Sequence, residues 1–138
     1  MAVQTKILQR LLEQLEEHLL TIERMSFTLE ELLSDIDIQH LIERRLQLAI
    51  ETCIDIASHI AAEQKLPGRE KASDVFLLLG KYKIIEPKLA ENLAKAVGFR
   101  NILIHEYAKV DHQLVFRYYQ DDLDDLRRFG QEISKKFL

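Results

Sequence analysis

Apolar residues recur at helical spacing through a long segment, from about Ile36 to Gln64, that contains neither glycine nor proline. The apolar set comprises Ile38, Ile42, Leu46, Ala49, Cys53, Ile56 and Ile60, widened by Leu41, Leu48, Ile50, Ile54 and Ala61. A stripe of this width is typical of a helix that is contacted on several sides. Because such a helix needs neighbours, this one segment strongly favours a helical assembly.

The rest of the chain supplies those neighbours. A first helix is predicted from about Val3 to Met25, with Ile7, Leu11, Leu15, Leu19 and Ile22 as its apolar stripe. Thr28 and Glu31 have the spacing of a capping box, which predicts a short turn of helix through Leu33. Further helices are predicted over about Ser73–Lys81, from Pro87 to about His105, and from about His112 to Lys136, the last capped by Asp111.

Only four glycines and two prolines interrupt the 138 residues, and no β-type alternation competes with the helical pattern. We therefore predict one domain over residues 1–138, an all-α up-and-down helical bundle of four main helices plus a short one. The spine of its last helix is predicted to be Val115, Tyr119, Leu126, Phe129, Ile133 and Phe137.

Composition limits the possible functions. Hydrophobic residues make up 47% and charged residues 30% of the chain, which excludes a disordered protein. The net charge of −4 argues against a simple electrostatic binder of nucleic acid. The chain has no apolar stretch long enough for a membrane span and no signal-peptide pattern, so we expect a cytoplasmic protein. Cys53, the single cysteine, is predicted to be buried and unreactive.

One segment, residues 100–107, carries chemistry that a scaffold does not need. It reads Arg100-Asn101-Ile102-Leu103-Ile104-His105-Glu106-Tyr107. Arginine offers a planar fork of donors for phosphate oxygens, and histidine can move protons near neutral pH. In a helix, Asn101 and His105 share one face, four residues apart. Together these groups are suited to cutting a phosphodiester without a metal.

RNA cleavage by its own 2′-hydroxyl needs a base, an acid and a group that holds the phosphoryl charge. His105 can be the base or the acid, Arg100 can hold the phosphate, and Asn101 can orient the imidazole or bind a non-bridging oxygen. One chain supplies a single such histidine. A symmetric dimer would bring two of them together.

Plainer readings of the same residues stay open. His105 could be an ordinary surface or capping group, and Arg100 could simply pair with Glu106 or Asp111. No metal site is expected, because His59 and Glu63 offer only two ligands at helical spacing. The acidic residues Asp121, Asp122, Asp124 and Asp125 are more typical of a solvated helix face than of a cation site. His112 is expected to begin a helix, Arg44 or Arg45 could border the cleft, and core packing is favoured for Tyr119.

Beyond this chemistry, the pattern Arg100-Asn101-x-x-x-His105-x-Tyr107 resembles the signature of HEPN-domain ribonucleases, and more narrowly that of the HepT-like toxins. Two longer blocks share the likeness. One runs from Glu43 to Ile60, and the other runs from Val97 to Tyr107 and is followed by Asp111. The resemblance extends over nearly the whole chain.

The resemblance implies a HEPN-like bundle that acts as a homodimeric, metal-independent endoribonuclease, without a cofactor, in a type VII-like toxin–antitoxin system. Arg100 and His105 would be catalytic and Asn101 would support them, in a cleft at the dimer interface. The partner would be a minimal nucleotidyltransferase antitoxin that adds AMP to Tyr107. That adduct would place a bulky anion where RNA phosphate must bind.

Two other functions compete with this one. A non-catalytic helical accessory subunit that binds a nucleotidyltransferase or a nucleotide would fit the acidic net charge. A purely structural dimerisation bundle would leave the cluster of polar residues at 100–107 unexplained.

Overall fold

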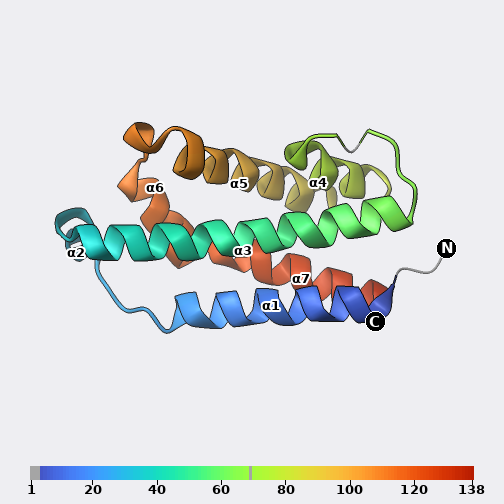
Figure 1. Cartoon of the computed structure of the whole chain (residues 1–138), viewed down its shortest axis with the longest axis horizontal. Helices are drawn as coiled ribbons and strands as arrows, with labels where there is room; N and C mark the ends of the chain where they lie inside the picture. The colour runs from blue at the N-terminus through green and yellow to red at the C-terminus, as the bar shows by residue number, and fades with distance from the viewer. Residues whose placement is uncertain (1–3, 69) are drawn as a thin grey trace.

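The structure, a computed structural model, describes residues 4–68 and 70–138. It is a bundle of helices, and no strand occurs among those residues (Figure 1). The long elements are α1 (Thr5–Glu23), α3 (Ile36–Glu63) and α5 (Pro87–His105), followed by a C-terminal helix in three pieces. The shorter helices are α2 (Leu29–Ser34) and α4 (Ala72–Lys81). The predicted all-α architecture and each predicted helical segment are confirmed. With the C-terminal helix counted as one, the described residues form five substantial helices and the short α2, one more than the four main helices and a short one that were predicted. Val3, the predicted start of the first helix, lies outside the described residues.

Helix α3 is the centre of the bundle. It runs between α1 and α7 (Leu123–Phe137) on one side and α4 and α5 on the other, and it contacts all four (Figure 1). This position explains the wide apolar stripe of the sequence, because Ile42, Cys53 and Ile60 are all fully buried along its length. Burial raises the pKa of the Cys53 thiol, as expected for an inert core cysteine.

The stripe of α1 begins one residue later than predicted. Ile7 is 43% exposed, whereas Leu8 is fully buried together with Ile22. Leu8 is seven residues before Leu15, which is two helical turns, so it lies on the same face. Ile7 lies beside that face, so its side chain is exposed to solvent.

Three helix starts in the described chain have side-chain caps. The Thr28 hydroxyl accepts from Glu31 N at 3.1 Å, and Thr28 N donates to the Glu31 carboxylate at 3.0 Å. Asp35 caps α3, and Asp111 caps α6 (His112–Arg117) by accepting from Gln113 N at 3.0 Å. These caps satisfy amides that a helix start leaves without intrahelical acceptors.

The C-terminal helix contains a π-helical turn, Tyr118–Asp122, between α6 and α7. Tyr119 packs against the core, as predicted, but Tyr118, which was not part of the predicted spine, is the more deeply buried of the two. Tyr118 stacks its ring on Phe99, whereas Tyr119 is half-buried, stacks on Phe27 and donates its hydroxyl proton to Met25 O. A π turn takes up one extra residue, so the positions before it are shifted by one from the spacing of an uninterrupted α-helix.

Helices α4 and α5 approach closely at Gly80. A Cβ atom built there would lie 2.7 Å from the Cβ of Ala90. The small size of Gly80 and Ala90 lets α4 and α5 pack closely in one layer. From this contact, α5 extends to the end of the molecule where α2 and α6 lie (Figure 1). In the described part of the chain, no helix combines the length and apolar character needed to cross a membrane.

Candidate functional site

The polar motif occupies the last two turns of α5 and the residues that follow. Helix α5 continues through Gly98 and ends at His105, as predicted, and Tyr107 begins the 3₁₀ turn η1 (Tyr107–Lys109). The side chains of Asn101 and His105 are exposed, and Tyr107 is 49% exposed. Because Asn101 and His105 are four residues apart in an intact helix, they share one solvent-facing surface.

Arg100 lies deeper than the other motif residues. Its side chain is 18% exposed, and its Nη1 atom is 3.8 Å from Glu51 Oε1 on α3. Its Nε atom is buried and has no hydrogen-bond partner among the described residues. The Glu51 carboxylate thus holds the guanidinium from the side of α3, and the Nε donor is left unpaired inside the protein.

The suggested pairing of Arg100 with Glu106 or Asp111 is wrong. Glu106 instead binds Lys109, with 3.3 Å between Nζ and Oε1, and Asp111 caps α6. Both residues are beyond the end of the helix, while Arg100 points from the helix interior toward α3. The ion-pair partner of Arg100 is Glu51, which is far away in the sequence but lies on α3, the helix that packs against α5.

A second polar cluster surrounds Tyr107. The rings of His40 and Tyr107 have centroids 6.1 Å apart, and His112 Nε2 is 3.5 Å from Glu43 Oε2. Glu43 is 6% exposed, one of the two polar residues buried in the described chain. Residues of α3, η1 and α6 therefore meet at one point beside the motif.

Burial raises the pKa of both acidic groups in this cluster. For Glu43, burial outweighs Tyr107, His112 and His40, each of which favours the charged form of the carboxyl. For Tyr107, the nearby Glu43 charge raises the pKa further. The two groups therefore act on each other across the boundary between the core and the solvent.

Sequence reasoning missed His40, Glu43 and Glu51 as members of the site. One signal was present for Glu43, because it is a charged residue next to Ile42 and three residues before Leu46, inside the apolar stripe. His112 begins α6, as expected, but it also contacts Glu43. Arg44 is exposed, and Arg45 has a buried Nε atom.

The other polar candidates are engaged in ordinary contacts. Asp122 binds Arg117 at 3.1 Å, and Asp124 binds Arg127 at 3.1 Å, so these acidic residues belong to an ion-paired helix face. Within the described residues, no three His, Cys, Asp or Glu side chains are grouped so that they could hold a metal ion.

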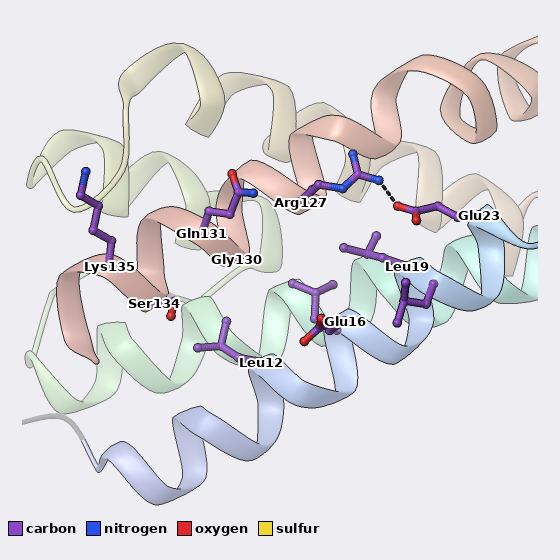
Figure 2. Close-up of a pocket in the computed structure, with 11 residues that line it drawn as sticks. Leu12, Glu16, Leu19, Glu23, Arg127, Gly130, Gln131, Ser134 and Lys135 are labelled. Carbon is purple, nitrogen blue, oxygen red and sulfur yellow. Dashed lines mark hydrogen bonds and ion pairs between the residues drawn. The ribbon is translucent and has the colours of Figure 1, made fainter.

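A groove of about 560 Å³ lies away from the motif, between α1 and α7. Figure 2 shows Leu12 and Leu19 on one wall, Ser134 and Lys135 on the other, and an ion pair between Arg127 and Glu23 at one end. None of the motif residues lines this groove. Asn101, His105 and Tyr107 are instead exposed at the surface of the chain, at the end of α5 and in η1.

Comparison with known proteins shows which family this chain belongs to. A family model described as ribonuclease HepT-like matches residues 8–133. The chain belongs to the HepT-like ribonuclease family. The match spans the bundle from α1 to α7, so the family assignment concerns the whole domain and not the short motif alone.

Two relatives of this chain are named as RNA nucleases. The mRNA nuclease HepT of Shewanella oneidensis is 37% identical over 95 residues, which is 69% of this chain and 71% of the relative. The tRNA nuclease HepT of Aphanizomenon flos-aquae is 39% identical over 100 residues, which is 72% of this chain and 67% of the relative. The expectation that this HepT-like chain is a ribonuclease is confirmed.

A solved structure extends the likeness to three dimensions. The tri-AMPylated HEPN toxin of Shewanella oneidensis, determined in complex with an MNT antitoxin, superposes with a TM-score of 0.87. It is 29% identical to this chain, and the match covers 94% of this chain and 97% of the toxin. The HEPN fold expected from the sequence is confirmed.

Proposed function

We propose that this HepT-like protein cleaves RNA as a toxin through Arg100, Asn101 and His105. The observation that carries the proposal is the placement of an exposed imidazole and an exposed amide on one face at the end of α5, next to a partly exposed arginine that Glu51 of α3 holds in place. A helix end that opens on solvent gives a long polymer access to these groups.

Each side chain has a defined task in the proposed reaction. The RNA 2′-oxygen attacks the adjacent phosphorus, His105 takes its proton, and the bond to the leaving 5′-oxygen breaks. Arg100 holds the negative charge that develops on the phosphoryl oxygens, and Asn101 orients the imidazole. The leaving oxygen needs a proton, which the same residue of a second copy would supply.

A homodimer is part of the proposal. Exposed apolar side chains are concentrated at the motif end of the bundle, where Leu33, Ile36, Leu41 and Ile104 are between 37% and 61% exposed. They come from the end of α2, the start of α3 and the end of α5, which lie at the same end of the molecule (Figure 1). A self-complementary contact over this end would bury apolar area and bring two motifs together.

The proposed partner is a minimal nucleotidyltransferase antitoxin that adds AMP to Tyr107. The half-exposed phenol at the motif is accessible to an enzyme, and the HEPN toxin of Shewanella oneidensis is AMPylated in its complex. An added phosphodiester beside Arg100 would compete with RNA for the same cation. We place this toxin in the cytoplasm, with its RNA substrate and its antitoxin.

The decisive experiment measures RNA cleavage by the purified protein in the presence of a chelator. We expect cleavage by the wild type and none by His105→Ala, with unchanged far-UV circular dichroism. His18→Ala, which removes a histidine from the middle of α1, is the matched control and should cleave normally. Persistent cleavage by His105→Ala would remove His105 from the catalytic set.

A further inference from the structure

A buried carboxylate belongs to the same polar cluster as the phenol that we propose as the AMP acceptor. The side chain of Glu43 is only 7% exposed, whereas Tyr107, with which it interacts electrostatically, is 49% exposed. Oε2 of Glu43 has no hydrogen-bond partner among the described residues, although His112 Nε2 is 3.5 Å away. Burying an acid with an acceptor atom that makes no hydrogen bond costs stability, so such a group marks a candidate functional site.

We infer that Glu43 is the proton acceptor for Tyr107 when the tyrosine takes up AMP. The inference rests on the proposed modification of Tyr107 and names a residue of this chain that would take part in it. A phenol is a weak nucleophile in its neutral form, so a neighbouring carboxylate that takes its proton activates it at the moment of attack.

The step balances as a transfer from a nucleoside triphosphate. The Tyr107 oxygen forms a bond to the α-phosphorus of ATP, the bond from that phosphorus to the bridging oxygen breaks, and pyrophosphate leaves. The phenolic proton passes to the Glu43 carboxylate and from there to solvent. The partner enzyme binds ATP, so this chain contributes the acceptor oxygen and its base.

The neighbouring imidazoles are suited to supporting roles. His112 of α6 faces Glu43 with its Nε2 atom and favours the charged, proton-accepting form of the carboxylate. His40 of α3 is tilted by 58° against the Tyr107 ring and packs on its side. Glu43, His40, Tyr107 and His112 are the titratable groups that act on one another here, and they come from α3, η1 and α6.

The test uses the full chain with the purified nucleotidyltransferase of the Shewanella oneidensis complex, magnesium and ATP, and follows AMP addition by intact mass. We expect Glu43→Gln to slow AMP addition about 100-fold, within the range for loss of a general base, with the KM for ATP unchanged. The rate of the wild type should rise with pH through the titration of Glu43, and the variant should lack that rise.

Three variants separate the possible outcomes. Glu63→Gln removes the same charge near the end of α3 and should be modified at the wild-type rate, and Glu43→Asp should regain part of the rate. If Tyr107→Phe is still modified, the proposed acceptor is wrong. If the wild type is modified at Tyr107 and Glu43→Gln keeps the full rate and pH profile, the role of Glu43 is wrong while the acceptor stands.

A measurement without the partner covers the case in which the foreign enzyme does not act on this chain. Tyrosine labelled with ¹³C at Cζ reports the ionisation of each phenol by NMR. Because the Glu43 charge raises the pKa of Tyr107, Glu43→Gln should lower that pKa. An unmoved Tyr107 titration would overturn the interaction on which the inference depends.

Discussion

At the scale of single residues, the buried acid Glu43 creates a conflict between stability and reactivity. Its pKa is raised in the folded protein because burial penalises the charged form more than Tyr107, His112 and His40 favour it. Between the ordinary carboxyl range and this raised pKa, the folded state binds more protons than the unfolded state. Stability therefore falls as pH rises through that window.

Glu43→Gln should remove this pH-dependent loss. At pH 7 we expect the variant to have a higher Tm than the wild type, and the difference should shrink as pH falls below the ordinary carboxyl range, where both side chains are neutral. Thermal unfolding followed by circular dichroism between pH 3 and pH 8 measures both curves. A variant that is less stable at every pH would mean that the contact with His112 outweighs burial.

At the scale of helices, two glycines in the same layer have opposite structural roles. A methyl group at Gly80 would collide with Ala90, whereas nothing in this chain lies within 4 Å of a Cβ built at Gly98. We expect Gly80→Ala to destabilise the fold by about 1–3 kcal/mol through overpacking of α4 against α5.

Gly98→Ala is the matched control within α5. Because this residue is helical and exposed, the substitution should stabilise the isolated fold by up to ~1 kcal/mol. Urea unfolding of both variants gives the two free energies of unfolding. A destabilised Gly98→Ala variant would contradict the open space seen beside α5.

The helices themselves were predictable from the sequence because their signals are local. The capping pair Thr28 and Glu31, the cap Asp111 and the proline at the start of α5 each act within one turn. The π turn was not predicted, because the spacing of apolar residues from Val115 to Leu126 fits a regular α-helix as well as a helix with a π turn. The difference is visible only in the packing of the folded chain, where Tyr118 stacks on Phe99.

The candidate site was predictable only where its proposed members are neighbours in the sequence. Arg100, Asn101, His105 and Tyr107 were proposed together because they are close in the sequence and match a family signature. Glu51 and Glu43 reach them from α3, about fifty residues or more earlier, and helix periodicity does not say which residues of two packed helices face each other.

At the scale of the whole molecule, the proposed dimer predicts a sharp contrast between two exposed leucines. Leu41 is 45% exposed on α3 near the motif, and Leu77 is 46% exposed on α4 toward the opposite end (Figure 1). Leu41→Glu should give a monomer by analytical ultracentrifugation and should lose most RNA cleavage, because burying an unpaired charge opposes association.

Leu77→Glu makes the same change in charge outside the proposed interface. It should remain a dimer and cleave RNA like the wild type. A monomeric Leu41→Glu protein with full activity would show that one chain suffices for cleavage, and a dimeric one would place the interface elsewhere.

The π turn gives the C-terminal helix one residue more than its register needs. Because a π turn takes up an extra residue locally, deleting one residue between Tyr118 and Asp122 should leave a regular α-helix with α6 and α7 in nearly the same orientation. With α7 anchored by Phe129 and Ile133, His112 should then stay beside Glu43. A deletion inside α6 itself, after His112, would instead turn that imidazole by about 100° and move it off the carboxylate. The spare residue therefore lies where the segment between the polar cluster and its anchors in the core can be shortened without losing alignment.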